Sequence, residues 1–461
     1  MTKTTKTINP STEQVLEEFQ LLSLDEANQA VDKAHEAFLS WKKASTEKRA
    51  ELVLNLAKLI RENKQELAAL MTKEMGKPKN QGEQEVEMCA AICEYTATEA
   101  IKALESEVRE VDGGKAIISY QPIGVILGIQ PWNFPLYQVI RYSISNIMAG
   151  NTTVLKHAPN VFGMAVKIQN MYEEAGFPKY VYQSLLTEAT IASKLIAHEK
   201  IRGVTFTGSE SVGKKIAEIA GSYAKKTVLE LGSNDAFIVL DDADIETTVK
   251  ACVTARMINN GETCVSAKRF VITEAKYDEF KEAFVKQLKE TKMGNPNEDE
   301  TDLGPMARED LRDKLHEQVK ESIDKGATAL LGCEVPDMKG FYYTPSILEN
   351  VKPGMPAYDD ELFGPVAAFI KVKDNEEAIK VANDSRYGLG GGIFSKDEDK
   401  AVQMAIEEFD TGMVNINGYG LAQPSLPFGG VKSSGYGREH GGFGITEFVN
   451  IKSVMISSPS Q

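Results

Sequence analysis

The residues best suited to covalent chemistry surround Cys264, in the segment NNGETCVSAKRF (259–270). Cys264 follows a helical stretch and a glycine and precedes a strand, so a turn there can expose the thiol to solvent. Backbone N–H groups around such a turn would lower the thiol pKa from about 8.5 and favour a nucleophile. Taken alone, a cysteine with apolar neighbours is more often a small core residue. The segment by itself leaves both interpretations open.

Two further segments end strands with groups that could assist a cysteine. TVLELGSND (227–235) puts Glu230 at the end of an apolar strand, as a paired structural charge or as a general base tuned by partial burial. GIQPWNFP (128–135) has two prolines that fix the backbone around Trp132 and Asn133, so the Asn133 amide could be held as a hydrogen-bond donor. From its own segment Glu230 is better explained as a structural charge, and the Trp132 turn is equally well explained by packing.

The segment IRGVTFTGSESVGKKIAEIAG (201–221) has the pattern of an anion site. A strand, then Gly208 and Ser209, then a helix would offer free N–H groups and the positive end of the helix dipole to a pyrophosphate. The GxGxxG fingerprint is absent, so the Rossmann motif itself does not apply. Ser209 is otherwise an ordinary N-cap, the default for a single serine in this place.

The acidic turn YDDELFGP (358–365) could present a carboxylate to ribose hydroxyls. Glu361 directly precedes a leucine and the stiff sequence FGP, which would hold its side chain in place. The alternative is a solvated acidic loop, because two aspartates adjoin it.

The elements that must position these groups follow an α/β pattern. After residue 115, short apolar runs alternate with amphipathic segments, which favours parallel sheets covered by helices. Helices are expected at 162–175, 211–220, 244–259, 276–290, 308–325, 375–384 and 398–408.

The first third of the chain is expected to be helical. Val31, Ala34, Phe38 and Trp41 share one helical face, and a long helix is expected from about 45 to 75, where Gly76 ends it. The segments change from cofactor-like to nucleophile-bearing near residue 233, where a domain boundary is expected.

The composition fits a globular protein of two or three domains, because 461 residues exceed one hydrophobic core. Its 52 basic and 67 acidic side chains give a net charge of −15, which argues against nucleic acid or an anionic membrane as a partner. The start of the chain has no apolar signal region and no stretch reaches the length of a membrane span, so a cytoplasmic location is expected.

The five cysteines and five histidines suggest neither disulfides nor a metal site. No CxxC pair occurs, and the histidines are scattered. Cys89 and Cys93, four residues apart in a helical segment, are expected to be buried structural thiols.

Taken together, these segments resemble the NAD(P)-dependent aldehyde dehydrogenase superfamily along nearly the whole chain. PWNFP, FTGS, LELG, the GxTC cysteine box, ELFGP and PFGGVKSSGYGRE (427–439) occur in the family's order and approximate spacing. Within the family, LKHAPNVFG (155–163) and LGPMAREDLRDKLHEQV (303–319) look most like a bacterial branch of succinic semialdehyde dehydrogenases.

The resemblance implies three parts: a Rossmann-like cofactor-binding domain, an α/β catalytic domain and a β-extension that joins subunits. We expect the cofactor domain over 1–103 and 125–232, the catalytic domain over 233–433, and the oligomerisation strands over 104–124 and 434–461. Dimers, often paired into tetramers, are usual for the family, so a homodimer or homotetramer is expected.

By similarity, Cys264 is the nucleophile that attacks an aldehyde carbonyl. The Asn133 amide and the Cys264 backbone N–H would stabilise the oxyanion, which suits fixed dipoles. Hydride transfer to a nicotinamide would leave a thioester on Cys264. Glu230 would activate the water that hydrolyses this thioester to a carboxylic acid.

The resemblance implies NAD as cofactor, with NADP also possible. Lys156 and Glu361 would hold ribose hydroxyls, and Pro159 stands where strict NAD enzymes often have glutamate and some NADP enzymes serine. Proline neither repels a 2′-phosphate nor donates to it. The residues carried over to the cofactor site are Trp132, Asn133, Lys156, Pro159, Gly208, Ser209, Leu231, Glu361 and Phe363.

Ser233 departs from the family pattern, because it stands where the family usually has a second glycine after the glutamate. If the backbone at this position needs a positive φ, serine is less favourable than glycine, and the Glu230 loop would sit differently.

The substrate is expected to be succinic semialdehyde. Arg141 matches the arginine that grips the far carboxylate in that branch, and its alternative role is an ion pair on a helix surface. Tyr137 and Phe428 are placed in the substrate pocket by the same likeness. A second arginine and a serine of that branch are replaced by Ile258 and Ala422, so another ω-carboxy or medium-chain aldehyde is the alternative.

Three other classes make different demands on the sequence. A cysteine hydrolase of nitrilase type would not need the FTGS and ELFGP segments. A dehydrogenase that passes the acyl group to coenzyme A commonly lacks the hydrolytic carboxylate, here Glu230. A non-enzymatic protein on this fold would tolerate the loss of Cys264 or Asn133, and both are present.

Overall fold

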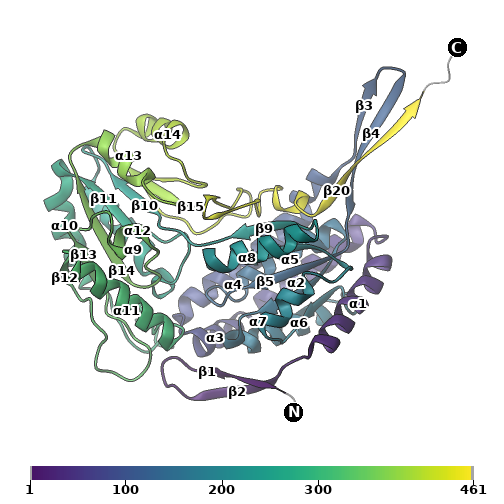
Figure 1. Ribbon diagram of the computed structural model, residues 1–461, viewed down its shortest axis with the longest axis horizontal. Coiled ribbons are helices and arrows are strands. Elements are labelled where there is room, and N and C mark those ends of the chain that lie inside the picture. The colour runs from purple at the N-terminus through teal and green to yellow at the C-terminus, as the bar shows by residue number, and fades with distance from the viewer. Residues whose placement is uncertain (1–2, 458–461) are drawn as a thin grey trace.

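The computed structural model, which describes residues 3–457, has two α/β lobes and a projecting arm of strands (Figure 1). Each lobe is built on a mainly parallel sheet covered by helices, which confirms the predicted α/β class. None of the described helices combines the length and the apolar composition needed to cross a membrane.

The first lobe contains a six-stranded sheet in the order β19-β9-β8-β5-β6-β7. Its pairs are parallel except at β19, which is antiparallel to β9. The central strands are almost fully buried: β5 (VILGIQ) is largely apolar, as expected for a strand covered on both faces, whereas β6 (TTVLKH) is buried although it carries polar residues at both ends. The strands are β5 (Val125–Gln130), β6 (Thr152–His157), β7 (Tyr182–Ser184), β8 (Ile201–Thr207), β9 (Lys226–Glu230) and β19 (Gly435–Tyr436).

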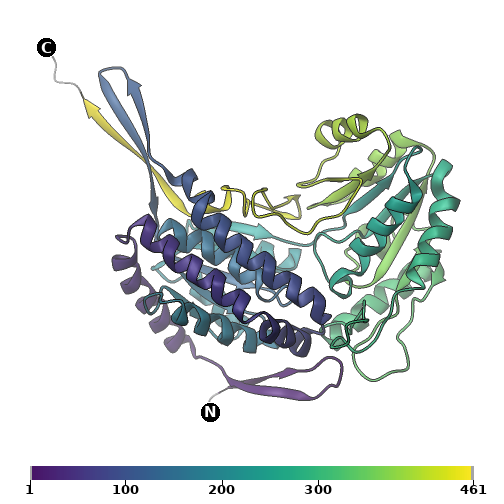
Figure 2. The same cartoon turned by 180° about the vertical axis from the view of Figure 1, so that it is seen from behind.

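Helices cover both faces of this sheet, as the two opposite views show (Figures 1 and 2). The longer helices are α1 (Leu24–Trp41), α2 (Thr46–Glu62), α3 (Lys64–Met75), α4 (Lys79–Thr98), α5 (Tyr137–Ala149), α6 (Phe162–Glu174) and α8 (Glu210–Ser222). The short ones are η1 (Ala100–Leu104), η2 (Pro159–Val161), α7 (Ala189–Leu195) and η4 (Gly444–Thr446).

The helix predicted from 45 to 75 is two helices, so that prediction was wrong in its length. Asn63 interrupts the run with φ −92° and ψ 13°, and its own backbone oxygen accepts the Leu67 N–H of the second helix. The predicted end at Gly76 is confirmed: its φ is +78°, and a Cβ there would lie 2.5 Å from the Pro305 oxygen.

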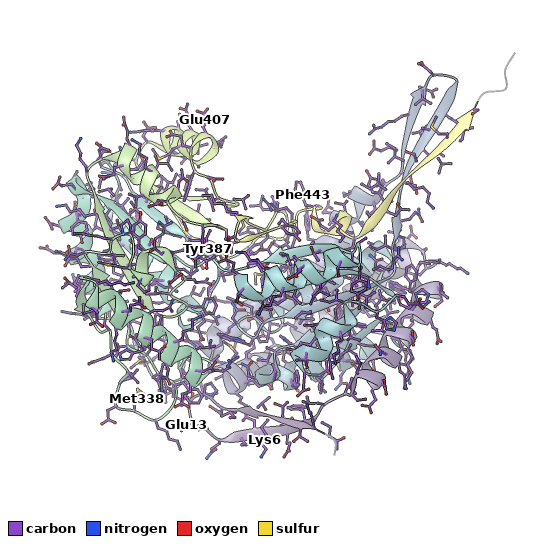
Figure 3. All side chains as sticks on the ribbon, in the orientation of Figure 1. Lys6, Glu13, Met338, Tyr387, Glu407 and Phe443 are labelled. Carbon is purple, nitrogen blue, oxygen red and sulfur yellow. The ribbon has the colours of Figure 1, made fainter. Side chains whose placement is uncertain are left out.

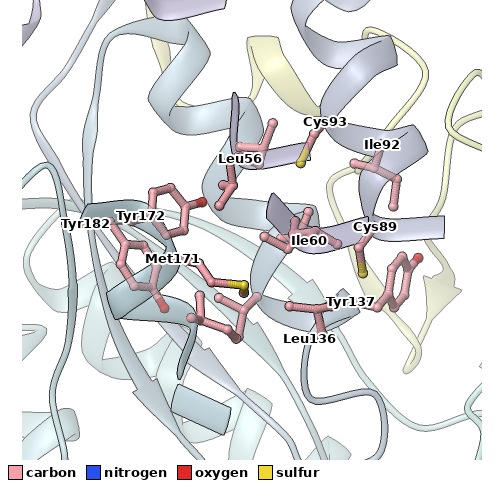
Figure 4. Packing of buried hydrophobic residues seen from close by; sticks show 14 of the residues in the cluster. Leu56, Ile60, Cys89, Ile92, Cys93, Leu136, Tyr137, Met171, Tyr172 and Tyr182 are labelled. Carbon is pink, nitrogen blue, oxygen red and sulfur yellow. The ribbon is translucent and has the colours of Figure 1, made fainter. Parts of the chain in front are cut away.

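The apolar face of α1 is buried, as its spacing predicted, and Ser23 and Glu26 form a capping box at its start. A neighbouring part of the core joins α2, α4, α5 and α6 (Figure 4). Cys89 and Cys93 lie in this cluster as free, buried thiols, which confirms that they are core residues.

The chain begins with a hairpin where helices were predicted. β1 (Thr4–Ile8) pairs antiparallel with β2 (Val15–Gln20). Only Thr7 and Phe19 are buried in these strands, and Phe19 packs edge-on against Phe162 at 5.9 Å. Because the strand pattern is so polar, the hairpin depends on contacts with distant residues that its own sequence does not reveal.

The second lobe contains a seven-stranded sheet in the order β12-β13-β14-β11-β10-β16-β17, with β12 antiparallel at its edge. Its strands are β10 (Ala236–Val239), β11 (Arg269–Thr273), β12 (Thr328–Leu331), β13 (Ser346–Glu349), β14 (Val366–Val372), β16 (Gly391–Phe394) and β17 (Asn415–Ile416). A two-stranded ladder joins β15 (Tyr387–Gly388) and β18 (Val431–Lys432).

The helices predicted for this lobe are confirmed within a few residues. They are α9 (Ile245–Met257), α10 (Glu274–Leu288), α11 (Glu309–Asp324), α13 (Asn375–Asn383) and α14 (Glu398–Glu407). Two short helices of this lobe were not predicted as elements of their own: η3 (Ile258–Gly261) and α12 (Pro356–Asp359).

The arm is a three-stranded antiparallel sheet that extends away from both lobes (Figures 1 and 2). It consists of β3 (Glu107–Val111), β4 (Gly114–Pro122) and β20 (Val449–Ser457). Within the segment predicted for this extension, β19 instead pairs with the first lobe. Residues 1–2 and 458–461 of the expected domains lie outside the described range.

Candidate active site

A cavity of about 460 Å³ lies between the lobes. Tyr387, one of its lining residues, sits where the lobes meet (Figure 3). The first lobe contributes the turn after β5, the start of α8 and the end of β9, and the second contributes the cysteine turn and α11. Of the residues assigned from sequence, the cavity brings together Trp132, Asn133, Gly208, Ser209, Leu231, Cys264, Glu361 and Phe363.

An unusual left-handed turn leads into Cys264. Asn259, Asn260 and Gly261 have φ values of 54°, 58° and 74°. At Gly261 a Cβ would lie 2.3 Å from the Gly364 backbone, so only glycine fits. Asparagine tolerates left-handed φ better than most residues, which explains the sequence NNG before the cysteine box.

The two asparagine amides tie this turn to the first lobe. Asn260 Nδ2 donates to the backbone oxygens of Gly76 (3.0 Å) and Pro305 (2.8 Å). Asn259 Nδ2 donates to the Asn133 backbone oxygen at 2.9 Å. The cysteine turn and the Asn133 loop are therefore held together by direct hydrogen bonds.

The Asn133 side chain is buried and points at the cysteine turn. Its Nδ2 donates to the Glu262 backbone oxygen at 3.1 Å. The loop beyond it is fixed at the start of α5, where Glu85 Oε1 accepts the N–H groups of Leu136 and Tyr137 at 3.0 and 2.9 Å. Because an amide nitrogen carries two hydrogens, Asn133 keeps one donor for a ligand.

Cys264 lines the cavity and is partly buried, unlike the other four cysteines, which are buried. Burial raises the pKa of this thiol to about 12, while the positive charges of Arg141 and Lys268 act in the opposite direction. The carboxylates Glu230 and Glu361 raise it further. The turn therefore presents the sulfur to the cavity, but the free thiol is not a ready thiolate.

Glu230 ends β9 and is only 2% exposed. Among the described residues neither of its carboxylate oxygens has a hydrogen-bond partner. Burial raises its pKa to about 8; Arg141 lowers this pKa and Glu439 raises it. A carboxylate without a paired cation and with such a pKa is suited to accept a proton near neutral pH. Glu230 is therefore not the paired structural charge that its own segment favoured.

The start of α8 opens onto the cavity. Ser209 has an extended backbone but makes no side-chain cap on the helix, unlike the N-cap role considered from sequence. The first N–H groups of this 13-residue helix are thus left for another acceptor. Trp132 packs edge-on against Phe363 at 5.9 Å beside it. The free N–H groups and the aromatic wall therefore have the chemistry of an anion site beside a flat apolar group.

Lys156 and Pro159 do not line this cavity. Lys156 is the fifth residue of β6 and lies opposite Ile129 of β5, whereas Pro159 begins η2. Burial lowers the pKa of Lys156 to about 8. Lys156 therefore lies near the carboxyl end of β6 and Pro159 just beyond it, at the same edge of the sheet as the turn that follows β5.

Arg141 forms a buried ion pair with Glu439, not an exposed pair on a helix surface. Its Nη2 donates to Thr207 Oγ1 at 3.0 Å, and its guanidinium lies 5.1 Å from the Tyr137 ring and 4.8 Å from the Phe428 ring. Arg141 does not line the large cavity. The three residues assigned to substrate nevertheless form one cluster.

This cluster adjoins the nucleophile. Cys264 and Ala422 pack against an apolar group that contains Phe428 and Val265. The Arg141 charge is also close enough to act on the thiol. A substrate on Cys264 would therefore extend toward an apolar surface with a cation beyond it.

Ser233 does not need the conformational freedom of glycine, so the expected backbone cost does not arise. It is not among the residues with positive φ. Its hydroxyl donates to the Cys264 backbone oxygen, and its N–H donates to Glu361 Oε1 at 3.2 Å.

Two charged residues were missed in the sequence. Lys268 is buried against the cysteine turn. The one local sign of its burial was its position directly before β11, whose residues are all buried. Arg386 donates through Nε to Glu210 at 3.0 Å and through Nη2 to Asp360 at 2.7 Å, so it links the two lobes at the mouth of the cavity.

The family model described as "Aldehyde dehydrogenase family" matches residues 1–454. The chain therefore belongs to the aldehyde dehydrogenase family. It is 44% identical to a succinate semialdehyde dehydrogenase [NAD(P)+] of Escherichia coli, over 97% of this chain and 96% of that protein. It is 41% identical to a succinate-semialdehyde dehydrogenase [NADP(+)] of Deinococcus radiodurans, over 97% and 94%.

A solved structure agrees with these relatives. The succinic semialdehyde dehydrogenase of Streptococcus pyogenes, determined in complex with NADP+, superposes with a TM-score of 0.96. It is 39% identical, and the match covers 98% of this chain and 100% of that one.

Proposed function

We propose that this chain oxidises succinic semialdehyde to succinate with NAD or NADP, through a thioester on Cys264. The observation that carries the proposal is the buried Arg141 cation beside the apolar cluster that holds Cys264. The relatives with up to 44% identity that act on this aldehyde support the same substrate.

In this proposal Cys264 adds to the aldehyde carbonyl as a thiolate. The Asn133 amide, already fixed against the cysteine turn, donates to the oxyanion that forms. When bound, the nicotinamide supplies a hydride acceptor for the carbonyl carbon. Cys264 then carries the acyl group as a thioester, and Glu230 takes a proton from the water that hydrolyses it.

The cofactor would be held by the first lobe and by Glu361. Gly208, Ser209 and the start of α8 would receive the phosphates, and Trp132 and Phe363 would bracket the cavity. Lys156 would reach the adenosine ribose. Pro159 offers no negative charge against a 2′-phosphate, which supports use of both NAD and NADP.

The substrate carboxylate would bind at Arg141, with Tyr137 and Phe428 as the walls. Arg141 Nη1 makes only a 3.5 Å contact with the Tyr137 hydroxyl and is therefore the edge most available to a ligand. Another ω-carboxy or medium-chain aldehyde is the alternative, because Ile258 and Ala422 replace two polar residues of related enzymes.

Replacing Arg141 with leucine should weaken turnover of succinic semialdehyde while sparing butanal. A hydrogen bond to a charged group is worth about 1.5–3 kcal/mol, so the ratio of kcat/KM for the two aldehydes should fall by about 10- to 150-fold. The measurement is the initial rate of cofactor reduction with each aldehyde, using NAD and NADP in parallel.

Loss of Arg141 leaves Glu439 as an unpaired buried carboxylate, so the variant could fail to fold. Arg141→Lys keeps the charge without the planar fork and should give a smaller change in the same direction. Equal loss for both aldehydes in a folded variant would make the arginine structural and remove the support for succinic semialdehyde.

We further propose the domain division 1–103 and 125–232, 233–433, and 104–124 with 434–461, and a homodimer or homotetramer in the cytoplasm. The arm supports the oligomer, since Val108, Ile451 and Met455 on its strands are 62–64% exposed apolar residues. Light scattering of the purified protein would measure the subunit number.

A further inference from the structure

Lys268 is a buried cation in direct contact with the nucleophile's backbone. It lies four residues after Cys264, just before β11, and is 1% exposed. Its Nζ donates to the Cys264 oxygen at 2.6 Å, to Ser233 Oγ at 2.8 Å and to the Thr263 oxygen at 3.1 Å. An ammonium group has three hydrogens, and each has an acceptor here.

The same cation also reaches the carboxylate proposed for the cofactor ribose. Lys268 Nζ lies 3.3 Å from Glu361 Oε1, which also accepts the Ser233 N–H. Glu361 and Cys264 line one cavity. Lys268 and Ser233 therefore connect the Cys264 backbone and the Glu361 carboxylate in one hydrogen-bonded network.

We propose that Lys268 is a positioning residue for the nucleophile: it holds the carbonyl side of the Cys264 turn and supplies a buried positive charge that favours the thiolate. Ser233 completes the contact, because its hydroxyl accepts from Lys268 and donates to the Cys264 oxygen. The inference rests on the proposed nucleophilic role of Cys264.

The charges that face the thiol explain why it needs this cation. Burial and the carboxylates Glu230 and Glu361 raise the pKa of Cys264, whereas Arg141 and Lys268 lower it. The hydroxyls of Tyr137 and Tyr419 also lie near enough to feel the thiolate charge. Of the two cations, Arg141 is held by Glu439 in the other lobe, and Lys268 is bonded to the cysteine turn itself.

The test is the rate at which iodoacetamide alkylates Cys264, measured from pH 6 to 10 without cofactor or aldehyde and located by mass spectrometry. Because this range lies below the pKa of the thiol, the rate reports the small thiolate fraction, and Lys268→Met should slow alkylation about tenfold at each pH, which corresponds to about 1.4 kcal/mol. Lys268→Arg keeps the charge and should recover most of the rate.

Lys281→Met is the matched control, because it removes a lysine whose Nζ pairs with Glu349 at 2.9 Å on the surface of the same lobe. Its alkylation profile should equal that of the parent. Thermal melting establishes that each variant is folded. If Lys268→Met does not fold, Ser233→Ala removes the bridging hydroxyl alone and should slow alkylation about threefold in the same direction.

An unchanged alkylation rate across the pH range in folded Lys268→Met, or in Ser233→Ala when that variant replaces it, would overturn the inference. Equal impairment of Lys268→Arg and Lys268→Met would also overturn it, because the charge would then be irrelevant. Adducts on a cysteine other than Cys264 would contradict the nucleophile itself. Since no aldehyde is present, none of these results depends on whether succinic semialdehyde is the substrate.

Discussion

Cys264→Ala should reduce turnover by roughly 10⁴-fold or more while cofactor affinity stays nearly unchanged. Removing the nucleophile of a covalent mechanism leaves only the catalysis that binding and the oxyanion donors provide, and losses on the order of 10⁶-fold are seen for such groups. Cys264 is one of the residues that line the cavity, whereas the start of α8 and the Trp132 loop belong to the part of its wall proposed for the cofactor.

Both halves of this prediction can be measured on one sample. Turnover is followed by absorbance of the reduced cofactor. Cofactor binding is followed by tryptophan fluorescence, because Trp132, one of two tryptophans in the chain, lines the cavity. Cys252→Ala is the matched control, since Cys252 is a free thiol buried in the second lobe away from the cavity. A Cys264→Ala enzyme with a tenth of the parent kcat would refute the nucleophile assignment.

The sequence was sufficient for the fold class and for most helices of the second lobe, because these segments carry strong periodic patterns. It failed at Thr4–Gln20, a polar hairpin that packs against distant residues, and at Asn63, where neither glycine nor proline marks the break between two helices. Phe19 of β2, for example, is buried and packs against Phe162, which lies 143 residues further along the chain. Local propensity cannot report such a contact.

In the candidate site, too, the sequence predicted individual residues but not their long-range contacts. Cys264 and Asn133 were selected by motif, and the structure brings both to one cavity. The surroundings that set their chemistry come from elsewhere: Asn133 is held by Asn259, and Arg141 is paired with a glutamate that lies 298 residues further along the chain. No spacing rule in a single sequence joins residues so far apart.

Ser233 shows how a departure from a family pattern can mislead. From sequence, a serine in place of glycine suggested backbone strain and a displaced Glu230 loop. In the structure its φ is not positive, and its hydroxyl fills the space between Lys268 and the Cys264 carbonyl. The substitution is therefore explained by a side-chain contact, which a rule about backbone freedom does not consider.

Glu230→Gln should separate the two halves of the reaction. Cys264 can still form the acyl intermediate, so a burst of about one reduced cofactor per site is expected. Steady turnover should fall by about 100- to 10,000-fold, the usual contribution of a general base. Mass spectrometry of the stalled enzyme should find the acyl group on Cys264. Steady turnover without a burst or an adduct would mean that another group activates the water.

The pH dependence gives an independent test of Glu230. Its pKa is raised to about 8 by burial, so only about one tenth of the carboxylate is ionised at pH 7. A base must be ionised to act, so the parent's steady rate should rise with pH and level off above about 8. The burst in Glu230→Gln reports the Cys264 thiol, whose pKa is about 12, and should keep rising beyond that pH. If the parent's deacylation rate is already flat from pH 6 to 9, Glu230 is not the base that limits turnover.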